Sequence, residues 1–476
     1  MRLKYIIYPL AIIALIVMLN GCEKFTSGIN TSSTDALDAS SVQLLSGAQL
    51  GYMQVFEGGL ARITAILTQQ ATGTERQYAA YEVYTLTSQD FINEWATAYV
   101  NCFADLKIGE KKAAASSQKN LLGAMQVLEG MEMGTMAALW GDVPYSQAGQ
   151  APGIIQPAYD AQMAVFDSVQ AVLSRGIANL ATYDQTLKGD IFSTSVYSTP
   201  TSPGAGSPYW SRLGYSAKAR YYMHAARHGH PGYTGADVQN VITNGLLGII
   251  ATDGSQDISF VHGTDQSLNQ NLWYSFANND RTGYMDASST FAEPMLYYRN
   301  VDGKSNDTAR LQYYYDKSLH YEDLNYGSGA FGVDHSYPAF SASETLLLLA
   351  EAYYYQGNTA SALTYLNSAR TYANTVFGSS LSAYVAGDFS TPAKLLQAIL
   401  NEEYLALAFQ IESFNLARRV NYQFTYTDSA SVVHTIAPTT GTVFPQRFPY
   451  SQDELTANPN VPKPIPTVFQ TTYVNQ

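Results

Sequence analysis

A short segment from Trp273 to Tyr284 combines flat aromatic rings with planar polar side chains. Tryptophan and tyrosine offer apolar faces, while amide, carboxylate and guanidinium groups form hydrogen bonds in fixed directions. A sugar ring has C–H patches on its faces and hydroxyls around its rim, so the two kinds of side chain match its two kinds of surface. The segment therefore predicts a ligand-binding loop with these candidate residues: Trp273, Tyr274, Asn278, Asp280, Arg281 and Tyr284.

Two further tyrosines, Tyr78 and Tyr81, lie in an early Tyr-rich connection and are candidates for the same surface. The chain contains 37 tyrosines. Tyrosine is frequent on recognition surfaces because it supplies a large, rigid contact area at low entropic cost. The alternative role for each ring is to pack in the core or to anchor an irregular loop to it, and the sequence leaves both roles open.

Catalytic motifs are absent from the sequence. It contains no Gly-x-Ser-x-Gly turn, no His-Glu-x-x-His motif, no phosphate-binding glycine loop and no Cys-x-x-Cys pair. A pair of carboxylates for glycoside hydrolysis is defined by a distance in space, and the sequence points to no particular pair. We therefore predict a binding protein that is not an enzyme and has no cofactor.

Three places contain side chains that metal sites use. His224, His228 and His230 put two imidazoles one helical turn apart, but imidazolium groups also stabilise the C-terminus of a helix. The oxygen-rich loops 253–257 and 300–307 lack the spacing of an EF-hand loop, and their Asp, Asn and Gly residues are typical of turns. Helix capping and turn formation are the predictions here, and no metal is predicted.

The first residues have the pattern of an export signal. Two basic residues precede an apolar run over 6–19, which is shorter than the roughly 20 residues of a membrane-spanning helix. The run is followed by Leu-Asn-Gly-Cys, which resembles the lipobox of bacterial lipoproteins, so Cys22 is predicted to carry lipid. Residues 1–21 are then a signal peptide, and the Ser/Thr-rich residues 22–40 are a flexible tether.

Composition narrows the possible partners. The net charge is −13, and loss of residues 1–21 with their two basic side chains makes it −15. Such an acidic chain lacks the basic surface that binds phosphate backbones, which excludes nucleic acid as a partner. With Cys22 lipidated, Cys102 has no cysteine for a disulfide, and it is predicted to be a buried, unreactive thiol.

The elements that would position the candidate residues are mostly helices. Apolar spacing predicts helices at about 41–56, 91–113, 120–139, 158–180, 216–228, 235–248, 341–377 (a hairpin) and 391–414. The irregular segments 193–215 and 252–340 between them are expected to form a binding face. We predict one mostly α-helical domain over 41–476 with few short strands, its scaffold at 41–180, 216–250 and 341–415, and a C-terminal wrap at 420–476.

The clearest local pattern is the hairpin at 341–377. Ser341 and Glu344 have the spacing of a capping box, Gly357 fits the left-handed end of a first helix, and Thr359 is predicted to cap a second. The order of small and large residues is typical of a tetratricopeptide repeat. One such hairpin cannot bury its own apolar face, so other helix pairs are expected to stack on it.

Four strings of residues behind the lipobox resemble the SusD-like (SusD/RagB) family of nutrient-binding outer-membrane lipoproteins. They are Trp140-Gly-Asp-Val-Pro-Tyr145, the hairpin from Glu351 to Arg370, the late helical segment from Glu402 to Arg419, and the closing segment from Pro445 to Asn460. The resemblance covers nearly the whole chain. These strings are expected to be scaffold, and the candidate ligand residues come from the loop composition alone.

The resemblance implies a tetratricopeptide-like scaffold with an irregular ligand-binding face. It also implies an outer-membrane location facing the cell surface, and a TonB-dependent, SusC-like transporter as partner. Many relatives bind oligosaccharides, and some are associated with peptide uptake. The leading prediction is a non-catalytic oligosaccharide-binding lipoprotein that delivers its ligand to the transporter. A peptide-capturing lipoprotein and an assembly scaffold without a small ligand are the alternatives.

Overall fold

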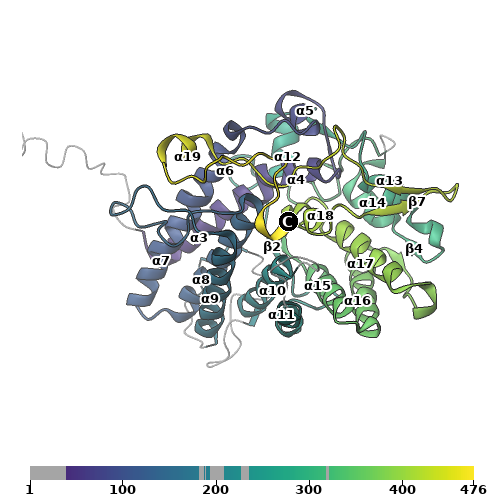
Figure 1. Cartoon of the computed structure of the whole chain (residues 1–476), viewed down its shortest axis with the longest axis horizontal. Coiled ribbons are helices and arrows are strands. Elements are labelled where there is room, and N and C mark those ends of the chain that lie inside the picture. Colours follow the sequence, from purple (N-terminus) through teal and green to yellow (C-terminus); the bar gives the residue numbers. More distant parts are fainter. Residues whose placement is uncertain (1–38, 182–186, 188, 193–207, 227–234, 318–320) are drawn as a thin grey trace, which may run out of the picture. The chain divides into compact units, whose positions relative to one another are not determined.

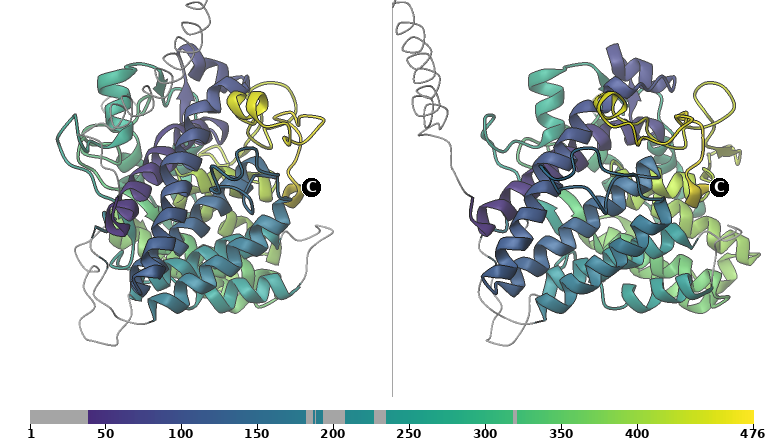
Figure 2. Two further views of the ribbon diagram at one scale, coloured as in Figure 1. Left: turned by 90° about the vertical axis from the view of Figure 1, so that its left-hand side faces the viewer. Right: turned by 60° about the vertical axis from the view of Figure 1, so that its left-hand side comes forward.

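A row of helices forms the scaffold, and each helix packs against the next. The computed structural model describes residues 39–181, 187, 189–192, 208–226, 235–317 and 321–476 (Figure 1). The row consists of α3 (Ser41–Met53), α7 (Ala104–Ala115), α8 (Lys119–Trp140), α9 (Gln162–Leu180), α10 (Pro208–Ala225), α11 (Gly235–Gly245), α15 (Ala342–Tyr355), α16 (Thr359–Phe377) and α17 (Pro392–Ala406). Figure 2 shows helices of this row side by side. Residues Ser41–Gln476 group into one unit by their contacts.

Helix α8 is surrounded by its neighbours and is buried over nearly its whole length. Because α7, α9 and α10 all contact it, apolar residues are needed on every side rather than in one stripe. Glycines allow the close packing. A Cβ atom at Gly134 would lie 2.3 Å from the ring of Tyr221 in α10, and one at Gly123 would lie 2.7 Å from the carbonyl oxygen of Gly176 in α9.

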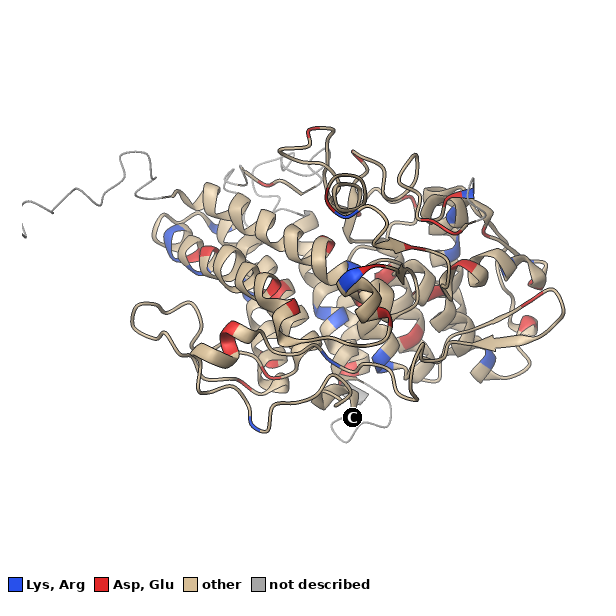
Figure 3. Cartoon of the chain, turned by 90° about the horizontal axis from the view of Figure 1, so that it is seen from above, with Lys and Arg blue, Asp and Glu red and all other residues tan. Residues whose placement is uncertain are grey.

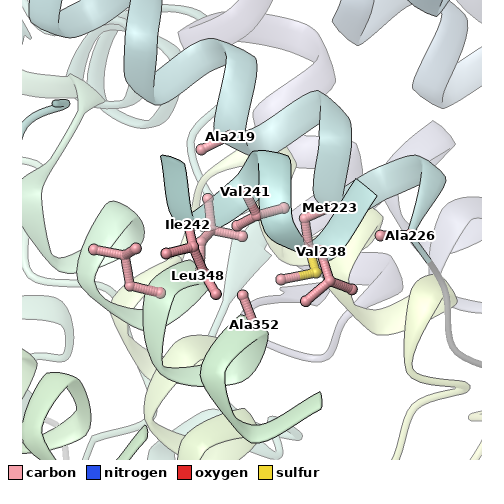
Figure 4. Close-up of a cluster of buried hydrophobic side chains, with 9 residues drawn as sticks. Ala219, Met223, Ala226, Val238, Val241, Ile242, Leu348 and Ala352 are labelled. Carbon is pink, nitrogen blue, oxygen red and sulfur yellow. The ribbon is translucent and has the colours of Figure 1, made fainter. Parts of the chain in front are cut away.

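An apolar cluster joins α10, α11 and α15 (Figure 4). Its buried members are Ala219, Met223, Ala226, Val238, Val241, Ile242, Leu348, Leu349 and Ala352. Small alanines alternate with larger side chains, which lets the three helices interdigitate. A second cluster joins α15, α16 and α17. The predicted stacking of helix pairs is therefore present, and the prediction of a mostly α-helical fold is confirmed.

Shorter elements form the irregular side of the molecule. The short helices are α4 (Leu60–Leu67), α5 (Arg76–Glu82), α6 (Ile92–Ala96), α12 (Leu272–Ser275), α13 (Ala292–Tyr297), α14 (Thr308–Tyr314), α18 (Ile411–Arg419) and α19 (Gln452–Ala457). Single 3-10 or π turns are η1 (Gln54–Gly59), η2 (Ser88–Phe91), η3 (Thr97–Phe103), η4 (Phe276–Asp280), η5 (Tyr298–Asp302), η7 (Ala386–Asp388) and η8 (Tyr473–Asn475). In Figure 1, α5, α12 and α13 lie above the helical row.

The described strands are very short and pair two by two in antiparallel sense. The pairs are β1 (Thr72–Gly73) with β3 (Met285–Asp286), β2 (Ile258–Phe260) with β5 (Tyr337–Phe340), β4 (Ser305–Asn306) with β6 (Ser380–Leu381), and β7 (Thr425–Thr427) with β8 (Val433–Thr435). The first three pairs join segments that are distant in sequence, so they hold the irregular segments in place.

The hairpin formed by α15 and α16 matches its prediction in extent but not in its caps. Gly357 has a φ of +78° at the end of the first helix, as predicted. The side chain of Asn358, not that of Thr359, accepts a hydrogen bond from the second helix. The capping box is also not formed, because Glu344 pairs with Arg220 across the core at 2.6 Å. Asp257 instead accepts the backbone N–H at the start of α15.

Two other helix boundaries differ from the predictions. Helix α10 begins at Pro208, within the segment that was predicted to be irregular, because Trp210 is buried and its Nε1 donates to Asp190 at 2.7 Å. The helix predicted over 391–414 is broken between α17 and α18. Phe409 has a φ of +63° at the break, and its backbone N–H donates to Gln70. At both boundaries a large aromatic ring is buried, that of Trp210 at the start of α10 and that of Phe409 at the break between α17 and α18.

Charged residues are interspersed along the ribbon (Figure 3). Several pair inside the fold, such as Arg310 with Glu402 at 2.8 Å. A buried guanidinium requires such partners because an isolated charge in the core is very costly. Cys102 is fully buried, and burial raises the pKa of its thiol, which agrees with its predicted structural role.

Candidate functional site

The two segments that carry the candidate residues are joined by the β1–β3 pair. Thr72 lies opposite Asp286 and Gly73 opposite Met285. Beyond the strands, Thr74 donates its backbone N–H to the carbonyl of Tyr284 at 3.0 Å. A Cβ atom at Gly73 would lie 2.0 Å from the carbonyl oxygen of Tyr78, so only glycine fits at this close approach.

Four aromatic rings pack together behind this pair. The ring centroid of Tyr78 lies 4.9 Å from Phe276, 5.3 Å from Tyr81 and 6.2 Å from Tyr284. Arg62 lies over the Phe276 ring and donates to the Tyr78 hydroxyl. The structure therefore brings together candidates from both segments. Tyr78 and Tyr81 are buried, however, so they anchor the loops to each other and do not face solvent.

Trp273 lies away from the surface, which does not fit its predicted role as a stacking platform. Its side chain is 1% exposed, with its ring 4.9 Å from Phe331 and 5.6 Å from Phe409. The side chain of Asn271 accepts the backbone N–H groups of Trp273 and Tyr274 and fixes the start of α12. Trp273 is therefore an anchor of this loop in the core, which is the alternative role that the sequence left open.

A cleft of about 600 Å³ opens where these loops meet. We call it the loop cleft. Its walls come from the residues before α5, the segment 277–288 and the segment 322–326, and they include Thr74, Asn278, Asp286, Ser288, Glu322 and Tyr326. Of the residues predicted from the sequence, Asn278 lines it. The other lining residues were not predicted from the sequence. The contacts that bring 74–75 and 322–326 to the cleft join distant segments, so they leave no local signal in the sequence.

The remaining candidates lie around the loop cleft without lining it. Tyr274 and Tyr284 are half-buried, and the carbonyl of Tyr274 accepts the amide N–H of Asn278 at 3.1 Å. Asp280 and Arg281 are exposed. The Arg281 guanidinium lies 5.8 Å from the Tyr284 ring and donates to the carbonyl of Asp280. These residues support the rim of the cleft.

The loop cleft is rich in oxygen atoms. Glu75, Asp286, Glu322 and Asp323 line it together. Burial raises the pKa of the Asp323 carboxyl, and the nearby carboxylates of Asp286 and Asp316 raise it further. One oxygen of Asp286 accepts the backbone N–H and the hydroxyl of Ser288 at 2.9 and 2.7 Å. Such acceptors suit a neutral, hydroxyl-rich ligand and repel an anionic one.

The histidines considered for metal binding make structural contacts where the structure describes them. His224 is buried in the last turn of α10 and pairs with Glu412 at 2.9 Å, so it does not cap that helix as predicted. Burial lowers the pKa of its imidazole. His228 and His230 lie outside the described residues, as does Cys22. In the described part of the chain, no group of three or more His, Cys, Asp or Glu side chains could hold a metal ion.

The two oxygen-rich loops form turns, as predicted. In 253–257, Asp253 accepts the backbone N–H of Ser255 two residues on, and in 300–307, Asp302 accepts that of Lys304. Asp257 is not a free ligand either, because it accepts hydrogen bonds from the Tyr372 hydroxyl and from the start of α15.

Comparison of this chain with models of protein families identifies one matching family. A family model named SusD-like and described as starch-binding associating with the outer membrane matches residues 32–450. The chain belongs to the SusD-like family. The resemblance found in the sequence is therefore confirmed. A search among curated proteins gave no match.

Solved structures show the fold of this SusD-like protein in several relatives. A SusD/RagB family protein from Bacteroides thetaiotaomicron has 18% identity and a TM-score of 0.64, covering 92% of this chain and 99% of its own. A chitin-binding SusD homolog from Flavobacterium johnsoniae has 13% identity and a TM-score of 0.65, covering 92% and 97%. A SusD homolog from Bacteroides fragilis has 18% identity and a TM-score of 0.62, covering 92% and 100%.

The family strings interlock in the scaffold of this SusD-like protein. Trp140 donates its Nε1 proton to the carbonyl of Pro449 at 2.7 Å. Arg418 donates to the carbonyl groups of Ala138 and Gln446, and Arg419 pairs with Glu351. The strings therefore depend on one another, since each buried arginine needs acceptors from another string. None of them belongs to the loop cleft.

The family is described by binding and by association with the outer membrane. Within the described ranges, no helix combines the length and apolar character that crossing a bilayer requires.

Proposed function

We propose that this SusD-like protein is a non-catalytic receptor for a neutral oligosaccharide. The loop cleft carries the proposal, because it places acceptor and donor groups around a solvent-accessible space of about 600 Å³. The side-chain oxygen of Asn278 and the second carboxylate oxygen of Asp286 make no hydrogen bond within the described part of the chain. These atoms remain available for the hydroxyls of a sugar.

The charge of the cleft narrows the class of sugar. Four carboxylates line it, and none of its lining residues is Lys or Arg. A uronic or sulfated chain would bring more negative charge to this place and would be repelled. Two structural relatives are chitin-binding proteins by name. Oligomers of N-acetylglucosamine are therefore the first probe, followed by malto-oligosaccharides.

We further propose that lipid on Cys22 holds the protein at the outer membrane and that a TonB-dependent, SusC-like transporter receives its ligand. The lipobox-like end of the export signal and the family's association with the outer membrane support this arrangement. Residues 23–40 would supply the slack between lipid and folded body. Co-purification with the outer-membrane transporter from native membranes tests the partner, and its absence from such a preparation would contradict the delivery role.

Isothermal titration calorimetry with the purified protein tests the receptor proposal. We expect binding of at least one neutral series, chito- or malto-oligosaccharides, and none of polygalacturonate oligomers. A lysine-rich peptide serves as the alternative probe, because the same carboxylates would attract it. Binding of the peptide without binding of any glycan would contradict the proposal, and release of shorter sugars during the titration would contradict the absence of catalysis.

A further inference from the structure

A second cleft lies beside α13, whose Met295 lines it. It has a volume of about 390 Å³ and is lined by α17, the segment after α13 and the first strand of the β7–β8 hairpin. We call it the hairpin cleft. The residues that matter for its chemistry are Tyr298, Arg299, Tyr384, Asn401, Tyr426 and Thr427.

Fixed aromatic rings form one part of the hairpin cleft. Tyr298 and Tyr426 are nearly parallel, with centroids 5.9 Å apart and an interplanar angle of 6°. Tyr426 is also stacked with His434 of β8 at 4.7 Å. Both tyrosines are half-buried and both line the cleft. Rings held in this way can receive an apolar ligand face without losing much side-chain freedom on binding.

The polar groups of the hairpin cleft fall into two sets. Asn401 exchanges hydrogen bonds with the backbone of Thr425, and Tyr384 donates to Asp302, so these side chains fix the walls. The hydroxyls of Tyr298, Tyr426 and Thr427, in contrast, make no hydrogen bond within the described part of the chain. They are free to bond a ligand.

The charge of the hairpin cleft is balanced. Arg299 lines it and pairs with Asp307 at 3.1 Å and with Glu402 at 2.5 Å. A guanidinium that is already neutralised by two carboxylates does not select an anion. The chemistry of this cleft therefore matches a neutral ligand with C–H faces and hydroxyl groups, as that of the loop cleft does.

A series of three neighbouring tyrosine rings begins in the hairpin cleft and ends at Tyr321, the residue before a lining residue of the loop cleft. The Tyr298 ring lies 5.0 Å from Tyr297, and the Tyr297 ring lies 6.4 Å from Tyr321. The next residue, Glu322, lines the loop cleft. Tyr297 is 56% exposed. A single exposed aromatic residue is ordinary, but a series of neighbouring rings that begins in one polar cleft and ends beside a residue of another is the arrangement expected for a chain-like ligand.

We propose that the hairpin cleft is a second subsite for the same neutral oligosaccharide chain, with Tyr321, Tyr297 and Tyr298 as the contact surface between the two subsites. This inference rests on the proposed glycan-binding function. It predicts a receptor for long chains, because a short oligosaccharide fills the loop cleft alone, whereas a longer one gains the contacts along the tyrosines and in the hairpin cleft.

Calorimetry with a length series tests the second subsite. The probes are chito-oligosaccharides and malto-oligosaccharides from the disaccharide to the octasaccharide. We expect the affinity of the wild type to rise with length. Tyr297→Ala and Tyr298→Ala should weaken binding of the longest chains by roughly two- to tenfold, the range for loss of one aromatic contact. Binding of the shortest chains should stay unchanged. Tyr297→Phe, which keeps the ring, should bind long chains like the wild type.

Tyr365→Ala is the matched control. Tyr365 is half-buried and stacks in parallel with Tyr353 at 5.4 Å, but it belongs to the helical scaffold. It should not change affinity at any length, and circular dichroism confirms that each variant is folded.

The possible failures are distinguishable. A wild type that binds short and long chains equally would overturn the second subsite and leave the proposed function intact. Folded Tyr297→Ala and Tyr298→Ala variants that bind every length like the wild type, or that weaken all lengths equally, would overturn it as well. A wild type that binds no glycan of any length would overturn the proposed function itself.

Discussion

The rings of Tyr78 and Tyr284 lie 6.2 Å apart between centroids, although more than 200 residues separate them in the sequence. The β1–β3 pair beside them has only two residues in each strand. So short a ladder is not stable alone. The packed rings therefore supply the cohesion that holds the walls of the loop cleft, where the proposed ligand groups lie.

Asn278 offers a direct test of the loop cleft. Asn278→Ala removes an amide that lines the cleft, and the loss of one hydrogen bond of about 1 kcal/mol should weaken glycan binding roughly fivefold. Asn279→Ala is the matched control, since this neighbour is also exposed but donates to Gln270 and does not line the cleft. Equal affinities of the two variants in calorimetry would place the ligand elsewhere.

Trp273 should matter for stability and not for binding. Trp273→Ala empties a buried site between Phe331 and Phe409, and such large-to-small changes cost about 3–5 kcal/mol. Urea unfolding measures this loss, and calorimetry on the folded variant should give the glycan affinity of the wild type. A variant of normal stability with lost affinity would show that the indole reaches the ligand after all.

The scaffold was predictable from the sequence, whereas the binding face was predictable only in part. The helices of the row show apolar spacing over many residues, and Gly357 marks the end of α15 by its need for a positive φ. The cap at the start of α15 was not predictable, because Glu344 is drawn into the core by Arg220. A local pattern cannot show that a distant charge will compete for the same carboxylate.

The segment at 273–284, predicted to be a ligand-binding loop, contributes residues to the loop cleft, but its composition could not separate anchors from residues that line the cleft. Trp273 and Asn278 are five residues apart, and one is buried while the other lines the cleft. The difference arises from contacts of α12 with the core around Phe409, which follows more than a hundred residues later. Only the tertiary structure contains that information.

The pair between Arg419 and Glu351 should be essential for the scaffold. Both side chains are almost fully buried, so Glu351→Ala leaves a guanidinium in the core with only the more distant Glu403, at 3.5 Å. Removing one partner of a buried pair costs about 3–5 kcal/mol. Lys304→Ala removes a partly exposed pair with Asp388 and should change the free energy of unfolding far less. Urea titrations of both variants give the comparison, and similar values would contradict it.

Asp257 should make stability depend on pH. Burial raises the pKa of its carboxyl to about 7, despite hydrogen bonds from Tyr372 and from the backbone N–H of Ala342 that lower it. The unfolded chain has the ordinary value of about 3.9. At a pH between these two pKa values, the carboxyl is protonated in the folded protein and ionised in the unfolded chain. Its contribution to the free energy of unfolding is therefore fully present below about 3.9 and is lost as the pH rises through about 7. In Asp257→Asn this decline should disappear, and urea unfolding across that pH range, compared with the wild type, measures the difference. Parallel curves would show that the carboxyl is ionised throughout.

Cys22 should control where the protein is found, without changing what it binds. In Cys22→Ala the thiol that is predicted to carry lipid is missing. We therefore expect the variant in the soluble fraction, with the glycan affinity of the wild type and with uptake lost. Membrane fractionation, calorimetry and growth on the bound glycan measure the three properties separately. Normal uptake by a soluble variant would show that the transporter holds its receptor by protein contacts, and that the tether over 22–40 adds nothing to delivery.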